Sequence, residues 1–315
     1  MAEGARGMSA EQERARQAEP RGRLLEPGQQ AVVHVADRDG GIRGVWSSDS
    51  VLVEAPNWLL DGSALLLNAD GDLWRLPLDE PALERLPTEG HPPLNNDHVL
   101  DPDGRHVLVS ANDWHLYRLP LAGGPAVRIT GGPADRPGLM HFLHGVSPDG
   151  RTLAFIGLEP ASGAGGDFGT ARSNVFTIGA DGSDLRQLTD DDAPTDGCEY
   201  SPDGEWILFN TERFDGHAQI ARIRTDGTGL EQLTFDERVN WFPHVAPTGA
   251  HAYYLAYPPG TTGHPADRDV EVKLVEGDAW DEATTVARFN GGQGTMNVNG
   301  WDPTGTRFAV VSYPR

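Results

Sequence analysis

One short phrase recurs six times along this chain of 315 residues. A hydrophobic or aromatic residue is followed by a small polar residue, by Pro-Asp-Gly or a close variant, and then by an apolar run, as in Tyr200-Ser-Pro-Asp-Gly-Glu-Trp-Ile-Leu-Phe. Periods of about 40 to 50 residues with strand-like content are typical of β-propeller blades. The phrases lie 42 to 56 residues apart, counted between their glycines, which are Gly62, Gly104, Gly150, Gly204, Gly249 and Gly305. The sequence therefore predicts an all-β fold, a six-bladed β-propeller.

Each repeat can be divided into four antiparallel strands. Asp-Gly pairs between alternating runs, as at 181–182 and 226–227, indicate hairpins, because glycine readily takes the positive φ of a tight turn. The sixth repeat has only two strands before residue 315, and the missing pair is predicted at 31–35 and 42–46. Joining these N-terminal strands to the last blade closes the ring and removes exposed sheet edges. We expect a disordered tail at 1–26 and one propeller domain over 27–315.

Composition excludes several function classes. The net charge of −22, with no basic stripe, would repel phosphate backbones, so nucleic acid is not an expected partner. Lysine occurs once, at Lys273, which makes Schiff-base chemistry a poor hypothesis, and no Walker-type phosphate loop is present. No apolar stretch approaches the 18 or so residues of a membrane span, and the first 26 residues lack the apolar core of a secretory signal. We expect a cytoplasmic protein that does not bind membranes.

The repeat resembles a known family. The Ser-Pro-Asp-Gly phrase with its apolar run, and the Leu-Thr pairs that end blades at 188–189 and 233–234, are similar to the repeats of TolB-type β-propellers over residues 31–315. The stretches Asn240-Trp-Phe-Pro-His, Gly263-His-Pro and Gly291-Gly-Gln-Gly-Thr also resemble a soluble TolB-like subgroup. This resemblance implies the fold and says almost nothing about activity, because one fold hosts many functions.

The loops of a propeller lie on two faces. The Pro-Asp-Gly turns and Asp-Gly hairpins should share one, which we call the Pro-Asp-Gly face. The blade-to-blade crossings and the loops between second and third strands should share the other, the loop-rich face. Its irregular segments are predicted at 163–169, 212–217, 260–268 and 291–297. Loops gathered on one rim of a rigid scaffold commonly build binding sites, so we expect the functional site on the loop-rich face.

Polar residues precede the repeat proline on the innermost strands, where small or apolar residues are usual. Three imidazoles and a carboxylate from four consecutive blades could meet over the central channel and hold a divalent metal, Mn, Zn, Fe or Ni. These predicted ligands are His98, His144, Glu199 and His244. The alternative is a solvated channel whose polar groups satisfy one another. Adjacent strand positions point to opposite faces, so convergence of the four requires the strand ends to bend.

Further candidates lie on the same approaches and on the rim. Catalytic roles are predicted for His144, His244 and Arg213, whose guanidinium would hold a carboxylate or polarise a carbonyl, or else form a surface ion pair. The aromatic rim residues Trp241, Phe242, Phe168 and Phe214 would stack on a sugar or anchor a protein. The predicted substrate-binding residues are Asn57, Asn96, Asp196, Asn240, Trp241, Gln293 and Asn297.

Two function classes remain open. The first is an enzyme, since the architecture resembles propeller lyases such as oligogalacturonate lyase. That resemblance implies metal-assisted proton abstraction and β-elimination on a small polyhydroxylated or carboxylated, carbohydrate-type substrate, with the metal stabilising the enolate. The second is a non-catalytic propeller that binds a protein or a small ligand on its rim.

Overall fold

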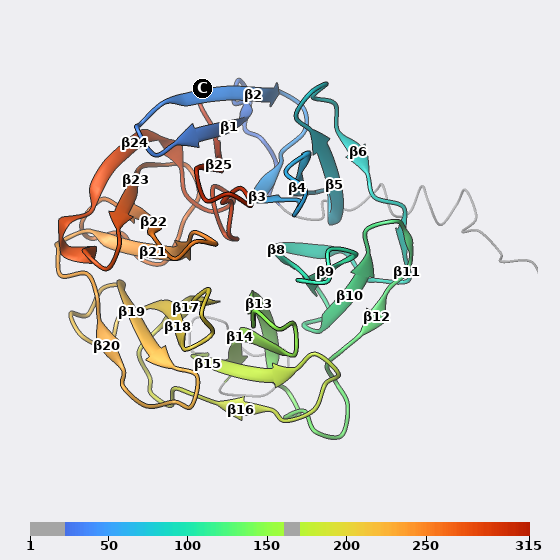
Figure 1. Ribbon diagram of the computed structural model, residues 1–315, viewed down its shortest axis with the longest axis vertical. Helices are drawn as coiled ribbons and strands as arrows, with labels where there is room; N and C mark the ends of the chain where they lie inside the picture. Colours follow the sequence, from blue (N-terminus) through green and yellow to red (C-terminus); the bar gives the residue numbers. More distant parts are fainter. Residues whose placement is uncertain (1–22, 161–170) are drawn as a thin grey trace, which may run out of the picture.

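The computed structural model describes residues 23–160 and 171–315, which form a ring of six blades (Figure 1). Blade 1 contains β3 (Glu54–Trp58), β4 (Ala64–Ala69), β5 (Asp72–Pro77) and β6 (Glu84–Arg85); blade 2 contains β8 (Leu94–Leu100), β9 (His106–Ala111), β10 (Leu116–Pro120) and β12 (Val127–Arg128). Blade 3 contains β13 (Met140–Val146), β14 (Thr152–Glu159), β15 (Arg172–Gly179) and β16 (Arg186–Gln187). Blade 4 contains β17 (Thr195–Tyr200), β18 (Trp206–Thr211), β19 (Gln219–Arg224) and β20 (Glu231–Gln232); blade 5 contains β21 (Val239–Val245), β22 (His251–Tyr257), β23 (Arg268–Glu276) and β24 (Thr284–Gly291). A short parallel pair, β7 (Thr88–Glu89) and β11 (Gly124–Pro125), lies between blades 1 and 2.

The sixth blade joins the two ends of the chain, as predicted. It contains β25 (Arg307–Ser312), β1 (Ala31–Asp37) and β2 (Ile42–Ser48), in that order from the inside outwards. β1 pairs antiparallel with β25, so that Val33 lies opposite Val311, and a bridge between Trp301 and Phe308 adds the innermost segment. Figure 1 shows the blue N-terminal strands beside the red β25. The prediction of a closed six-bladed β-propeller is therefore confirmed.

The recurring phrase forms a self-capped turn. In blade 3 the Ser147 hydroxyl donates to Asp149 at 2.7 Å and accepts the backbone N–H of Thr152 at 2.9 Å. Gly150 takes a φ of 71°, which an L side chain would resist. These bonds satisfy the backbone at the start of the second strand, and they explain why Ser-Pro-Asp-Gly recurs at 201–204 and close variants of it begin the other blades.

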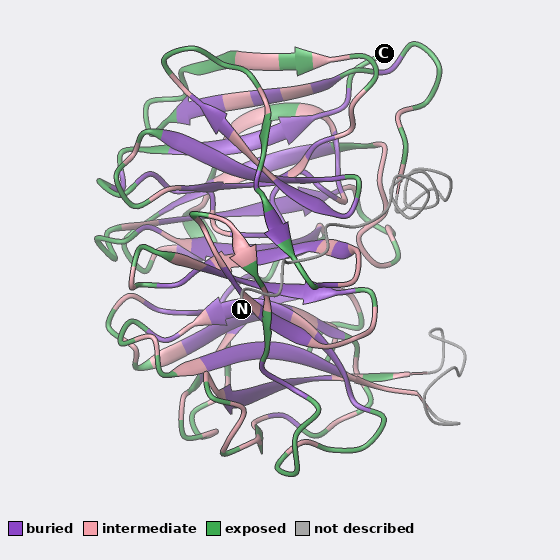
Figure 2. Ribbon diagram, turned by 90° about the vertical axis from the view of Figure 1, so that its right-hand side faces the viewer, coloured by how far each residue is buried: buried purple, intermediate pink, exposed green. Residues whose placement is uncertain are grey.

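The hydrophobic core is divided among the blade interfaces. The described residues form six apolar clusters, and each lies between two neighbouring blades; one, for example, joins Leu208 and Ile220 of blade 4 to Tyr254 of blade 5. Between blades 5 and 6 the rings of Tyr253 and Phe308 stack with centroids 4.5 Å apart. Figure 2 shows these buried strands through the body of the molecule, with exposed turns at its edges. Each blade thus buries its faces against its neighbours, which makes the ring rigid.

Two expectations fall partly or wholly outside the described residues. Of the tail predicted at 1–26, residues 1–22 lie outside them, but Arg23 is part of the fold: its guanidinium lies 4.0 Å from the Tyr313 ring and 2.8 Å from Asp267. These contacts make residues 23–26 part of the folded domain, although the sequence predicted them as tail. The predicted loop at 163–169, with Phe168, lies outside the described residues. No described helix is long and apolar enough to cross a membrane.

Candidate functional site

A cavity of about 340 Å³ opens on the loop-rich face, among the inner strands of blades 2 to 5 and the segment that begins blade 6. Its walls combine amides, carboxylates, two histidines and aromatic rings. Six of the residues predicted as site residues line it, namely Asn96, His144, Asp196, Trp241, Gln293 and Asn297. The other lining residues are Asn95, Asp97, Phe142, Ile156, Leu158, Ser173, Pro194, Thr195, Phe242 and His264. The structure therefore gathers half of the predicted set around one cavity.

Irregular strand register brings these side chains together. In each of the five inner strands β3, β8, β13, β17 and β21, the pairing with the second strand shifts partway along. On β13, Leu143 pairs with Phe155 and Gly145 with Ala154, which leaves His144 as the unpaired extra residue. A bulge of this kind re-aims side chains at the rim of a sheet. It supplies the bend that convergence of the inner-strand residues requires.

Positive φ angles mark the same shifts on other blades. Ala55, Gly197 and Phe242 occupy equivalent places on β3, β17 and β21, with φ values of 55°, 64° and 54°. A Cβ on Gly197 would lie 2.9 Å from Cδ1 of Phe242, so this position needs glycine for space as well as for conformation. Phe242, a bulky residue in the left-handed region and a wall of the cavity, is a strained position of the kind found at functional sites.

A buried histidine between two carboxylates forms the most polarised part of the cavity. Nε2 of His144 lies 3.1 Å from Oδ1 of Asp196, and its Nδ1 lies 3.3 Å from the carbonyl oxygen of Asn297. Burial alone would lower the pKa of His144, but Asp97 and the hydrogen bond to Asp196 raise it to about 9. The ring is therefore an imidazolium at neutral pH and donates through both nitrogens.

The two carboxylates differ in their affinity for protons. Burial raises the pKa of Asp97 to about 6; Asp196 adds to this rise, and the charge of His144 opposes it. Burial also acts to raise the pKa of Asp196, but the hydrogen bond from His144 and its charge outweigh burial, so the net shift is downward. Two titratable groups whose environments push their pKa values apart are the usual arrangement of an acid–base pair.

Aromatic rings form one wall and amides another. The His264 ring lies 4.4 Å from the Trp241 ring and edge-on to Phe242 at 5.4 Å, and its Nδ1 is 3.9 Å from Oδ2 of Asp196. On the amide side, Asn297 Nδ2 donates to Gln293 Oε1 at 3.1 Å, and Gln293 Nε2 donates to Asn96 Oδ1 at 3.4 Å. Such a pairing of a flat apolar wall with amide donors and acceptors suits a ligand with hydroxyl groups on an apolar ring.

The comparisons with known proteins agree with this architecture. No protein-family model matches the sequence. The chain is 36% identical, over 277 residues, to an uncharacterised protein of Agrobacterium fabrum, covering 86% of this chain and 88% of that protein. It superposes on a solved Agrobacterium tumefaciens protein assigned to TolB with a TM-score of 0.80 and 34% identity, covering 90% of this chain and 98% of the other. The chain belongs to the TolB-type β-propeller family. A manganese-bound oligogalacturonate lyase, 14% identical with a TM-score of 0.52 over 82% of this chain and 67% of that one, shares the fold alone.

In this TolB-type propeller the four predicted metal ligands do not form one ligand set. His144 is engaged with Asp196 in the cavity, whereas both ring nitrogens of His244 are used deeper in the channel, at 2.7 Å from Glu199 Oε2 and 2.7 Å from the carbonyl oxygen of Met296. Glu199 Oε1 in turn accepts from the Asn299 amide at 2.7 Å. These partners satisfy His144, Glu199 and His244 without an ion, and none of the four predicted ligands belongs to a potential ion-binding group among the described residues. The residues present therefore do not fit the predicted metal.

His98, the remaining member of that set, is isolated. Burial lowers its pKa to about 4, against the opposing effect of the Leu66 and Asn96 backbone groups, so the ring is neutral; neither of its nitrogens makes a hydrogen bond of ordinary geometry with the described residues. Nearby on blade 1, Asn57 donates to the carbonyl oxygen of Asn299 while its own Oδ1 lacks a partner. Both residues belong to the central channel and not to the lining of the cavity.

Two other predicted residues also lie away from the cavity. The Arg213 guanidinium lies 3.5 Å from the Asp191 carboxylate, and its side chain is about a third exposed. Arg213 therefore forms the surface ion pair that was the alternative to a catalytic role. Asn240 is fully buried, and its amide donates to Gln219, Thr234 and Asp236. It anchors the crossing into blade 5, because a buried amide must find partners. Neither side chain lines the cavity.

Sequence reasoning missed Asp97 and His264, which line the cavity beside the predicted residues. Asp97 directly precedes His98, and only the histidine was predicted as a site residue. The shifted register of β8 places Asp97 at the cavity. His264 lies in the loop predicted at 260–268 and in the Gly263-His-Pro stretch that resembles the TolB-like subgroup, but it was not predicted as a site residue. Both its place in that stretch and its place in a loop of the loop-rich face were available signals for it.

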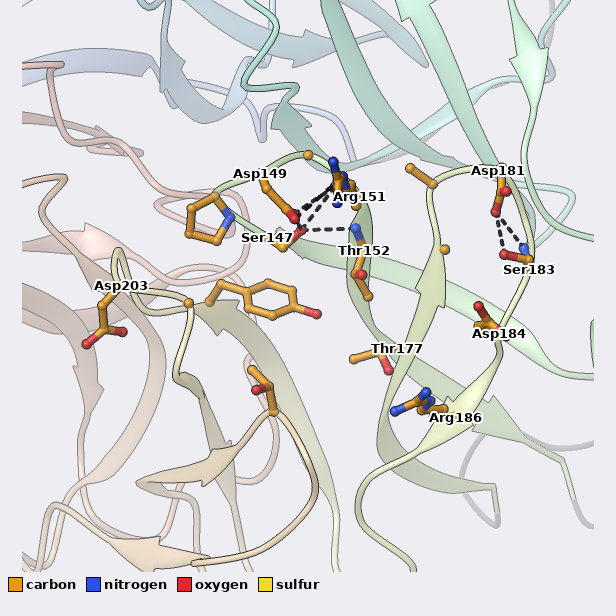
Figure 3. A pocket seen from close by; sticks show the side chains of 17 residues that line it. Ser147, Asp149, Arg151, Thr152, Thr177, Asp181, Ser183, Asp184, Arg186 and Asp203 are labelled. Atoms are coloured by element: carbon orange, nitrogen blue, oxygen red, sulfur yellow. Dashed lines mark hydrogen bonds and ion pairs between the residues drawn. The ribbon is translucent and has the colours of Figure 1, made fainter.

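The Pro-Asp-Gly face carries a larger but shallower hollow of about 930 Å³ between blades 3 and 4 (Figure 3). Its carboxylates serve their own turns: Asp149 binds the Ser147 hydroxyl, and Asp181 accepts from the backbone and hydroxyl of Ser183. Figure 3 shows these short-range pairs pointing back to the turns that carry them. The hollow contains no buried pair of titratable groups, so the cavity on the loop-rich face is the better candidate site.

Proposed function

We propose that this TolB-type propeller is an enzyme that acts on a small polyhydroxylated, carbohydrate-type substrate by proton abstraction and β-elimination. The observation that carries the proposal is the buried His144 imidazolium, held by Asp196 and facing Asp97 in the wall of a closed-in cavity. Oligogalacturonate lyase, which shares the fold, is solved with manganese. In this chain the imidazolium would supply the positive charge that a metal supplies elsewhere.

The proposed roles follow from charge and proton affinity. Asp97, whose pKa of about 6 lies close to neutral pH, takes the proton from the carbon next to a carbonyl or carboxyl group. The electron pair moves onto the carbonyl oxygen, where the positive field of His144 and the amides of Asn297 and Gln293 stabilise it. Collapse of this enolate expels the β-substituent, which leaves with the electron pair of the broken bond and takes a proton from water.

The charge of the site restricts the substrate. With Asp97 and Asp196 ionised and His144 protonated, these three groups carry a net charge of −1 at neutral pH, since the pKa of His264 is lowered by burial. The chain as a whole is also acidic, at −22. Both facts favour a neutral sugar derivative over a polyuronate, because a multiply charged substrate would be repelled on approach. Trp241 offers a face for the sugar ring.

The test is a panel of neutral sugars, lactones, sugar acids and short uronates. Binding would be measured by thermal shift and calorimetry, and elimination by the ultraviolet absorbance of the conjugated double bond that it creates. We expect binding and turnover of one neutral class, with turnover lost in Asp97→Asn. Binding that survives in Asp97→Asn, with no turnover by the wild type of any bound sugar, would instead support the alternative function, a non-catalytic binding propeller.

A further inference from the structure

A second cluster of titratable side chains, outside the cavity, joins blades 2 and 3. His115 precedes β10, Asp135 lies in the crossing from β12 to β13, and His141 lies on β13. One nitrogen or oxygen of each residue lies within 4.8 Å of those of the other two. The His141 side chain is fully buried and that of Asp135 is 6% exposed. Three metal-ligating side chains from two blades therefore share one small, enclosed volume.

The hydrogen bonds orient His141 as a ligand would be oriented. Its Nδ1 lies 2.8 Å from the carbonyl oxygen of Trp114, which can only accept, so Nδ1 carries a proton. The other nitrogen, Nε2, lies 3.1 Å from Oδ1 of Asp135. With Nδ1 protonated, this contact is favourable only when a proton or a metal ion lies between Nε2 and the carboxylate. Histidine ligands of metals are commonly held in this way, by an N–H donated to a backbone carbonyl.

The other two side chains are positioned in a similar manner. Nδ1 of His115 lies 3.0 Å from the Thr130 hydroxyl, whose oxygen also accepts the Leu116 backbone N–H at 3.0 Å. When Nδ1 donates to this oxygen, Nε2 of His115 is left free to bind an ion. The Asp135 carboxylate is oriented by the backbone N–H groups of Gly131 and Arg136, at 2.7 and 2.8 Å. Its only ion-pair partner among the described residues is His141.

A comparable cluster on the Pro-Asp-Gly face lacks this property. Asp101, Asp103 and His106 are equally close together, but Arg118 lies 2.9 Å from Asp101 and 2.8 Å from Asp103. The guanidinium already neutralises those carboxylates, so they should attract a metal ion only weakly. Within residues 23–160 and 171–315 no arginine or lysine pairs with His115, Asp135 or His141, so a metal ion would meet no competing guanidinium or ammonium group there.

We propose that His115, Asp135 and His141 bind one zinc-class divalent ion. Two imidazoles and one carboxylate suit Zn²⁺, with a water molecule in the fourth position. The ion would link blade 2 to the crossing and to the first strand of blade 3. The ion would also restrict motion of the cavity wall. Phe142, which follows His141, lines that wall, and its ring lies 5.9 Å from the Trp114 ring. The site does not depend on the function proposed for the cavity.

The test uses the full chain without a histidine tag, freed of metal by a chelator. Titration with Zn²⁺ by calorimetry, and with Co²⁺ by visible absorbance, should give one equivalent with tetrahedral cobalt bands, and Zn²⁺ should raise the melting temperature. His115→Gln and Asp135→Asn should each weaken binding at least about 100-fold, since losing a ligand costs more than losing a group that orients one, about 10- to 100-fold. His106→Gln, in the cluster already neutralised by Arg118, is the matched control and should bind as the wild type does.

Several results would overturn this proposal. They are a wild type that binds no equivalent of Zn²⁺ at micromolar concentration, unchanged affinity in His115→Gln, or equal loss in His106→Gln. His115 is only partly buried, so its variant should fold, and the melting curve of each metal-free variant checks this. If a variant does not fold, the visible spectrum of the cobalt-loaded wild type tests the site instead. Octahedral cobalt bands, or no cobalt bands at all, would reject the proposed site.

Discussion

His144 and Asp196 meet across the interface of blades 3 and 4, with Nε2 of one 3.1 Å from Oδ1 of the other. Each residue lies beside a shift in strand register, on β13 and β17 respectively. Asp97 from blade 2 adds a second carboxylate to the same cavity. Three blades thus contribute one charged group each, and the pKa values of His144 and Asp97 each depend on the other two groups. The following predictions rest mainly on this arrangement.

The charge of His144 should make stability depend on pH. Its folded pKa of about 9 lies above the ordinary 6.5, so the ion stabilises the fold fully below about pH 6.5, and this contribution is lost as pH rises through 9. The difference corresponds to a contribution on the order of 3 kcal/mol. Urea unfolding between pH 6 and 9.5 should show the decline in the wild type and not in His144→Gln. Parallel profiles for the two proteins would contradict the assignment.

Turnover should require an ionised Asp97. Asp97→Asn keeps the shape of the side chain but removes the base, so we expect the rate to fall about 10²- to 10⁴-fold with little change in ligand affinity. The wild-type rate should be bell-shaped in pH, rising near 6 with Asp97 and falling near 9 with His144. Steady-state kinetics over this pH range would check both limbs. A variant with full activity would exclude Asp97 as the base.

The two faces should respond differently to substitution. Gln293→Ala removes an amide that lines the cavity and bonds to Asn96 and Asn297, so ligand affinity should fall about fivefold, in line with the loss of about 1 kcal/mol for a hydrogen bond. Glu205→Lys reverses a charge on the exposed Pro-Asp-Gly face and should leave affinity unchanged. Calorimetry with the best ligand of the panel measures both. Equal losses would place the site elsewhere.

Removal of the N-terminal strands should open the ring. A chain without residues 1–46 lacks all of β1 and most of β2, which leaves β25 as an unpaired edge, so we expect insoluble or non-cooperatively unfolding protein. A chain without residues 1–26 keeps both strands but loses the contacts of Arg23 with Asp267 and Tyr313, which should cost about 2 kcal/mol. Thermal melts compare both with a chain that begins at Arg23. Cooperative unfolding of the shortest chain would refute the closure.

The repeat determined the fold because its information is local. The Ser147-Pro-Asp-Gly150 sequence specifies a capped turn, and six turns of this sequence or a close variant, each followed by a strand, leave few architectures other than a closed ring. The same counting identified His144 and Asp196 on inner strands and Asn297 on the approach to the last blade, while Gln293 was predicted from the loop at 291–297; all four line the cavity. His144 and Asp196 could be found because a polar side chain at an inner-strand position departs from the pattern of the repeat.

Only the tertiary structure decided which of these polar residues act together. The register shifts on β13 and β21 accompany His144 facing the cavity and His244 bound to Glu199 and Met296, although the two histidines lie only one position apart when counted back from Pro148 and Pro247. A bulge depends on pairing with another strand, and the pKa of a buried imidazole depends on charges from other blades. Both are non-local properties, so they arise when the ring closes and cannot be seen in any single repeat.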